Sequence, residues 1–212
     1  MRDRFNPPDS PEAMVDPARA ALVVWDMQRG MAGRAPGVDS IKQTVSALVT
    51  AADVASIPVI WSRHVALPLA FTTAGRRLQL MQRQKVNSPR DLKPHMQPDD
   101  PEVAFLPGMK PAPHHLILDK TTPSFFIGTP FDSALRATET ETIVLCGVAT
   151  ERGIEHTARH AMALGYYVVI VEDGVGSFTT EGHEMGMAFL RSAMLVMPAD
   201  KILAVWQGKA QS

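Results

Sequence analysis

Residues 20–28 read AALVVWDMQ, an unbroken apolar run that leads directly into an aspartate. A continuous apolar run of this length is typical of a parallel strand that is covered on both faces. The following segment, 40–55, has helical apolar spacing, and a second short strand is predicted at 58–61, just before His64. The beginning of the chain therefore predicts a strand–helix–strand unit of an α/β fold.

The same alternation returns after residue 113. Repeated alternation predicts a Rossmann-like, three-layer α/β/α domain with a mostly parallel six-stranded sheet over residues 19–212. Its further strands are predicted at 116–118, 142–146, 167–171 and 195–197, and its helices at 129–138, 151–164 and 181–194.

Two segments lack this alternation. Residues 1–18 are polar and proline-rich, which predicts an extended N-terminal arm. Residues 65–113 contain eight prolines, which predicts an irregular excursion or lid with one helix near 75–84. An interface segment or a flexible insertion is the alternative interpretation of this excursion.

Composition excludes several classes of protein. A formal net charge of -1 argues against nucleic acid as a partner. The single cysteine, Cys146, permits neither an intrachain disulfide nor a cysteine metal cluster, which favours a reducing, cytoplasmic location. The N-terminus lacks the apolar core of a signal peptide, and no apolar run reaches the length of a membrane span.

Polar residues follow several of the predicted strands at the point where each strand ends. They include Asp26, His64, Lys120 and Asp173. Ligands of open α/β sheets bind beyond the carboxyl ends of the strands, so these side chains are expected to share one edge. An acid and a base brought together there have the general form of a hydrolytic site. We therefore expect Asp26 and Lys120 to converge.

Four segments, taken in order and spacing, resemble the motifs of the isochorismatase-like (cysteine hydrolase) family. They are VVWDMQ at 23–28, KTTPSFF at 120–126, LCGVAT at 145–150 and VEDG at 171–174. The resemblance extends from about residue 20 to residue 197. It implies a hydrolase of a small molecule that needs no cofactor. Family members are commonly dimers or tetramers, so a homodimer or homotetramer is expected, with the apolar tail 202–206 as a candidate interface.

The resemblance also implies the roles of the central residues. Asp26 corresponds to the general acid/base of the family, and Lys120 to the lysine that assists it. The nucleophilic cysteine of most members corresponds to Gly153, so covalent catalysis through a thiol is impossible at this position. Cys146 lies within a predicted strand and is interpreted as a buried, inert cysteine.

Family members that cleave the vinyl ether of isochorismate carry glycine at the same position. The resemblance therefore implies that Asp26 protonates an enol ether, without a nucleophilic side chain. One alternative is a C–N (amide) hydrolase in which Asp26 activates a water held in the space vacated at Gly153. Another is a catalytically silent binding protein of the family.

The resemblance further implies a cis peptide bond at Val148–Ala149, whose neighbourhood would form an oxyanion hole. Family nicotinamidases bind a metal through an Asp-x-His segment, but the corresponding residues here are Ser62-Arg63-His64, so no metal is expected. His114 and His115 are adjacent in a predicted strand and are expected to point to opposite faces. Substrate contacts are expected from Gln28, His64, Phe126, Val148, Ala149 and Thr150.

Overall fold

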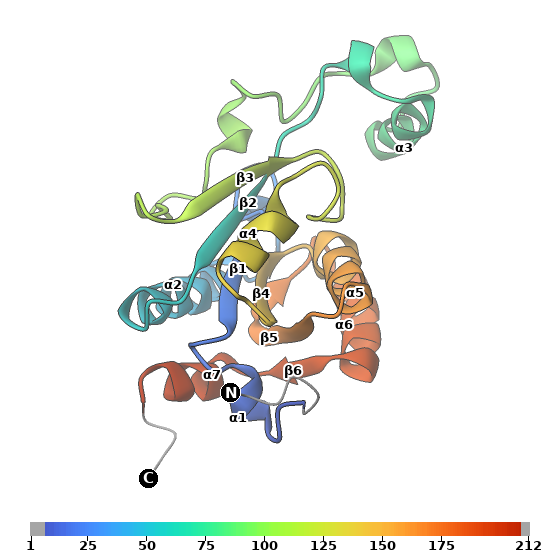
Figure 1. The fold of residues 1–212 in the computed structure, drawn as a ribbon. Helices are drawn as coiled ribbons and strands as arrows, with labels where there is room; N and C mark the ends of the chain where they lie inside the picture. Colours follow the sequence, from blue (N-terminus) through green and yellow to red (C-terminus); the bar gives the residue numbers. More distant parts are fainter. Residues whose placement is uncertain (1–6, 209–212) are drawn as a thin grey trace.

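The computed structural model describes residues 7–208. Its strands form one all-parallel sheet in the order β3-β2-β1-β4-β5-β6 (Figure 1). This confirms the predicted Rossmann-like architecture, with every strand parallel. The strands are β1 (Ala20–Trp25), β2 (Val59–His64), β3 (Leu116–Lys120), β4 (Thr142–Val148), β5 (Tyr167–Gly176) and β6 (Leu195–Met197).

Helices cover both faces of the sheet. Successive side chains of a strand point to opposite faces, so a fully apolar strand such as β1 must be covered on both sides. In β1, Leu22 and Val24 pack against one face layer, formed mainly by α2 and α7. Val23 and Trp25 point to the other face, which is covered by α4, α5 and α6. The helices are α1 (Pro11–Met14), α2 (Val38–Val54), α3 (Ala74–Gln84), α4 (Phe131–Ala137), α5 (Glu155–Ala163), α6 (Thr180–Ala193) and α7 (Ala199–Trp206).

The two ends of the described chain pack together, which corrects two expectations. Ser10 caps the short helix α1, so residues 10–15 are not an extended arm, while residues 1–6 lie outside the described residues. The Trp206 indole N–H donates to the Val15 carbonyl at 2.8 Å. Ile202 and Trp206 are buried in the core of the domain itself, so this tail does not present them as an interface.

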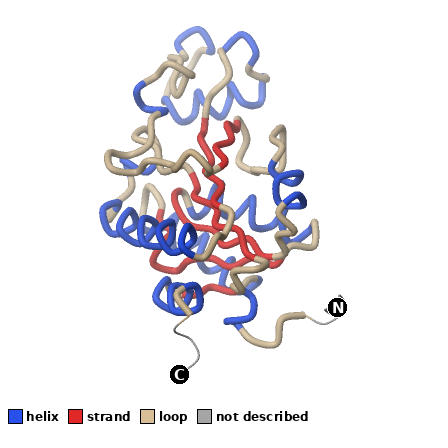
Figure 2. The backbone as a smooth tube through the Cα atoms, turned by 60° about the vertical axis from the view of Figure 1, so that its left-hand side comes forward, coloured by secondary structure: helices blue, strands red, loops and turns tan. Residues whose placement is uncertain are grey.

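The excursion at residues 65–113 contains α3 and short 3₁₀ turns. Figures 1 and 2 show α3 and its flanking turns projecting away from the sheet. The later part of the excursion returns to the segment that follows β1, where the Leu106 N–H donates to the Met27 carbonyl at 2.9 Å. Among the described residues, no helix is long and apolar enough to cross a membrane.

Candidate active site

A buried ion pair lies at the carboxyl edge of the sheet. Lys120 Nζ at the end of β3 donates to Asp26 Oδ2 just after β1, at 2.7 Å. The two side chains are only 3% and 2% exposed. Burial lowers the pKa of the Lys120 ammonium, and the charge of Asp26 opposes that shift. The predicted convergence of Asp26 and Lys120 is therefore present in the structure.

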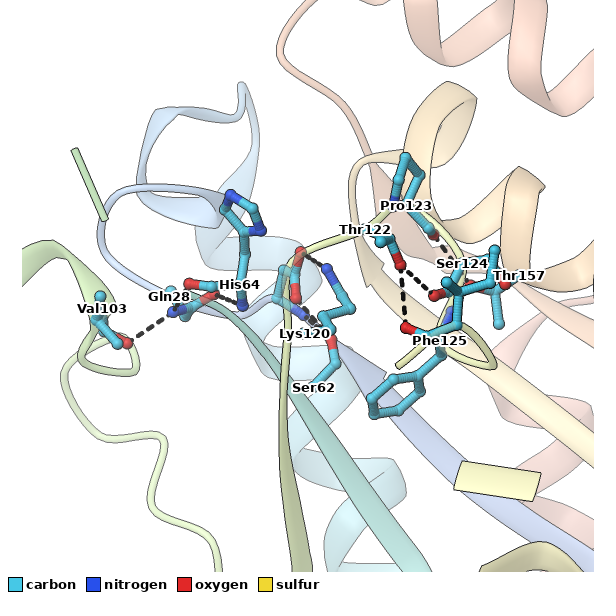
Figure 3. A network of polar contacts seen from close by, with 12 residues as sticks. Gln28, Ser62, His64, Val103, Lys120, Thr122, Pro123, Ser124, Phe125 and Thr157 are labelled. Atoms are coloured by element: carbon cyan, nitrogen blue, oxygen red, sulfur yellow. Dashed lines mark hydrogen bonds and ion pairs between the residues drawn. The ribbon is translucent and has the colours of Figure 1, made fainter. Parts of the chain in front are cut away.

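Ser62 fixes the orientation of Asp26 from the neighbouring strand β2. Its Oγ donates to Asp26 Oδ1 at 2.6 Å and accepts from the Asp26 backbone N–H at 3.0 Å (Figure 3). Asp26 itself has a φ of 44°, a left-handed conformation that aspartate tolerates better than most residues. Ser62 was not among the predicted site residues, although it directly follows the strand predicted at 58–61 and lies within β2 two residues before His64.

The Trp25 side chain fills the space beside Gly153. A Cβ placed on Gly153 would come within 3.0 Å of the indole atoms Nε1, Cε2 and Cζ2. Trp25 is 1% exposed and packs edge-on against Phe125, with ring centroids 5.4 Å apart. The indole therefore takes the space left by the absent Cβ, and the water of the amide-hydrolase alternative would have to come from the cavity. The same indole faces Lys120, whose Nζ lies 4.3 Å from the ring centroid.

The chain between β4 and α5 forms the adjoining wall of the site. Val148–Ala149 is a cis peptide bond, which confirms that expectation. It leads into η5 (Thr150–Ile154), a π-helical turn that carries Gly153 and precedes α5. Because β1 and β4 are neighbours at the point where the strand order reverses, this wall and Asp26 meet at the switch point of the sheet.

A cavity of about 1190 Å³ opens over this edge, between the sheet and the excursion. The predicted site residues Asp26, Lys120, Gly153, His64 and Ala149 line it. Its opposite wall comes from α3 and the turns after it, and α3 contributes Arg76 and Arg83, which were not among the predicted site residues. Their positions could not be predicted because the course of the excursion is not encoded in a regular pattern.

Four predicted substrate contacts do not line this cavity. Gln28 is fully buried: its side chain accepts from the His64 N–H at 2.7 Å and donates to the His64 and Val103 carbonyls (Figure 3). It therefore joins β2 to the excursion and has no free group for a substrate. The others are Phe126, which packs on the Phe131 ring, Val148, which is in the core, and Thr150, whose hydroxyl donates to the Gly176 carbonyl.

His64 lies beside the ion pair as an uncharged group. Burial lowers its pKa to about 4, with a further contribution from the positive charge of Lys120. At neutral pH the imidazole is therefore neutral and capable of both donating and accepting a hydrogen bond. Its backbone is fixed by Gln28, so the ring has a defined place at the cavity wall.

Cys146 does not substitute for the missing nucleophile. Its side chain is 0% exposed within β4, and its thiol donates weakly to the Val23 carbonyl. Burial raises the pKa of the thiol well above its usual range, so the reactive thiolate is disfavoured. This confirms the interpretation of Cys146 as a buried cysteine.

A second group of histidines lies away from the cavity. His114 and His115 precede β3 in a turn, and both Nε2 atoms contact Asp53 Oδ1, at 3.1 and 2.7 Å. The expectation that they point to opposite faces is therefore wrong, because strand alternation does not apply in a turn. His115 Nδ1 accepts from the Trp61 indole and the Ala112 N–H, so its proton is on Nε2, toward Asp53. In that tautomer Nε2 carries the proton and the Nδ1 lone pair is already used as a hydrogen-bond acceptor, so neither ring nitrogen is free to bind a metal.

Comparison with known proteins agrees with this geometry. The isochorismatase domain profile matches residues 20–200. Ureidoacrylate amidohydrolase RutB of Methylobacterium radiotolerans is 28% identical over 209 residues, which cover 89% of this chain and 76% of that protein. The isochorismatase family protein YwoC of Bacillus subtilis is 45% identical over 65 residues, which are 31% of this chain and about a third (34%) of YwoC.

A solved structure shows the same fold. The cysteine hydrolase from Pseudomonas syringae pv. phaseolicola 1448A superimposes with a TM-score of 0.79 at 23% identity, covering 92% of this chain and 95% of that one. The family profile extends over most of the chain and includes β1, β4 and the residues of the buried ion pair. The chain thus belongs to the isochorismatase family.

Proposed function

We propose that this protein is a hydrolase that cleaves an enol (vinyl) ether of isochorismate type without a covalent intermediate. The observation that carries the proposal is the packing of Trp25 against Gly153. The position where a nucleophilic side chain would extend is filled by an indole, which leaves no room for a thiol. The remaining reactive groups are the Asp26–Lys120 pair and the neutral His64.

Enol-ether cleavage requires an acid and a water, which the buried pair and the cavity would supply. A proton moves from the Asp26 carboxyl to the terminal methylene carbon, and an oxocarbenium ion forms. Water adds to that cation and loses a proton, and the resulting hemiketal breaks down to pyruvate and a diol. The Asp26–Lys120 pair, which has given its shared proton to the substrate, takes up the proton that the water releases, and Lys120 Nζ, at 2.7 Å from Asp26 Oδ2, is placed to pass it to the carboxylate.

Burial of the pair supports proton transfer within it. The pair can exist as an ammonium with a carboxylate or as an amine with a carboxylic acid. Removing both groups from water reduces the free-energy difference between these two states, because the charged groups are poorly solvated in the protein interior. The lowered pKa of Lys120 acts in the same direction. We therefore assign the acid function to the pair as a whole, with Lys120 as the group that exchanges a proton with Asp26.

Amide hydrolysis is the competing function, since the relative RutB is an ureidoacrylate amidohydrolase. The test is to incubate the purified protein with isochorismate and, separately, with ureidoacrylate and simple amides. Pyruvate is followed with lactate dehydrogenase, and ammonia with glutamate dehydrogenase. We expect pyruvate from isochorismate and no ammonia from the amides. Ammonia release without pyruvate release would refute the proposal.

A further inference from the structure

Arginines from two separate parts of the chain face the same cavity. Arg76 and Arg83 are on α3 in the excursion, and Arg152 is in η5 on the opposite wall. Arg76 and Arg83 are seven residues apart, so they lie on one face of the helix, about 10 Å apart along its axis. Gln79 and Leu80 lie between them on that face and also line the cavity.

Among the described residues, Arg152 is paired with Glu151, whereas Arg76 and Arg83 have no ion-pair partner. The cavity lining contains six lysine and arginine side chains against three carboxylates, in a chain whose formal net charge is -1. Two of the carboxylates are already paired, Asp26 with Lys120 and Glu102 with Arg34. The third is Asp91, which is exposed on the excursion. The positive charge is therefore concentrated at this cavity.

The hydrogen bonds of the three arginines leave donors free for a ligand. Arg76 Nη1 donates to the neutral Gln79 side chain at 3.1 Å, and Arg83 has no hydrogen-bond or ion-pair partner among the described residues. Arg152 contacts Glu151 through Nε at 3.2 Å and remains 46% exposed. Burial lowers the pKa values of Arg76 and Arg83, and the charge of Arg152 lowers both further. The three like charges share one cavity, and they repel one another there.

We infer that the cavity binds a small organic carboxylate anion between α3 and η5, with Arg76, Arg83 and Arg152 as its carboxylate-binding groups. The inference rests on the proposed function for the reaction, but it concerns binding alone. Guanidinium groups bind carboxylates through paired hydrogen bonds, and a ligand with two carboxylates would reach both walls. Such a ligand would remove the repulsion between the excursion and η5.

The position of the arginines also relates a bound anion to the proposed acid, Asp26. Arg152 is next to Gly153, which packs on Trp25, and Trp25 directly precedes Asp26. Asp26 and the three arginines line the same cavity, so a carboxylate held there shares that space with the acid. The cavity volume of about 1190 Å³ accommodates a drug-sized ligand together with water.

Calorimetric titration of the full chain with isophthalate, a dianion, and with isophthalamide, its neutral counterpart, tests this inference. We expect saturable binding of isophthalate, no binding of the amide, and a loss of about tenfold to a hundredfold in affinity for Arg76→Gln, Arg83→Gln and Arg152→Gln. Arg90→Gln makes the same charge change on the excursion outside the cavity and should bind like the parent.

Several outcomes would overturn the inference: no isophthalate binding by the parent, equal binding of the amide, or unchanged affinity in all three cavity variants. Thermal unfolding of each variant verifies that it is folded. Because the titration involves no turnover, its result is independent of the reaction assay. Binding without pyruvate release would refute only the proposed reaction, and pyruvate release without arginine dependence would refute only the anion site.

Discussion

Adding a side chain at Gly153 should destabilise the protein because Trp25 already fills that space. In Gly153→Cys, the new Cβ would come within 3.0 Å of three indole atoms, where normal carbon contacts are about 3.5–4.0 Å. The indole has little freedom to move, because it is 1% exposed and held against Phe125. Overpacking of a buried site typically costs about 1–3 kcal/mol, and we expect about 3 kcal/mol here.

Urea and thermal unfolding of the purified variants measure this cost. A loss of about 3 kcal/mol corresponds to a decrease in Tm of about 6–12 °C for a domain of this size. Gly153→Ala adds the same Cβ without a thiol and should lose a similar amount. Gly75→Ala is the matched control, because no atom lies within 4 Å of its added Cβ at the exposed start of α3. That variant should be as stable as the parent or slightly more stable.

Trp25→Phe provides a second test of the same contact. If the indole causes the clash, Gly153→Ala should cost less in the Trp25→Phe background than in the parent, and a double-mutant cycle measures the difference. The reasoning would be refuted if Gly153→Ala and Gly153→Cys were as stable as the parent, or if the cycle showed no coupling. Gly153→Cys should also gain no amide-cleaving activity.

Three further predictions concern the groups around the site. Lys120→Ala leaves Asp26 buried without its cation, so urea unfolding should show a loss of about 3–5 kcal/mol, and turnover should decrease. The pKa of His64 falls from 6.5 to about 4 on folding, so the unfolded chain binds more protons between these values and stability should decrease as the pH falls through that window, by up to about 3 kcal/mol. His64→Gln should remove that part of the acid sensitivity in urea unfolding at pH 4 to 7, and an unchanged pH profile would contradict it. Cys146 should resist thiol reagents in the native protein and react after unfolding, and loss of turnover on brief iodoacetamide treatment would contradict its burial.

The regular parts of the fold were predictable because the helical spacing of apolar residues and the apolar runs of strands can be recognised within short stretches of sequence. β1 is an unbroken apolar run, β4 and the first half of β5 are mostly apolar, and the carboxyl ends of all the parallel strands, β3 included, meet at one edge. That geometry brought Asp26 and Lys120 together in the prediction. The cis bond at Val148–Ala149 and the significance of Gly153 came from the family resemblance and not from the pattern itself.

The details that depend on packing between distant segments were not predictable. Nothing near Gly153 in the sequence indicates that Trp25, more than a hundred residues earlier, fills its space. The cavity-facing arginines depend on the path of a proline-rich excursion with no regular period. Gln28 was expected to contact substrate, but its side-chain amide is hydrogen-bonded to backbone groups of His64 in β2 and Val103 in the excursion. Local sequence rules contain no information on such partners.

The rate of pyruvate release from isochorismate by Asp26→Asn tests the central claim most directly. If Asp26 is the acid, its replacement by an amide removes the transferable proton, and the rate should fall by about 10²–10⁴-fold. Asp119→Asn is the matched control, because its carboxylate lies on β3 next to Lys120 but pairs with Arg63 instead. We expect parent-like turnover from Asp119→Asn and none above background from Asp26→Asn. Folded Asp26→Asn protein that releases pyruvate within a few-fold of the parent rate would contradict the mechanism.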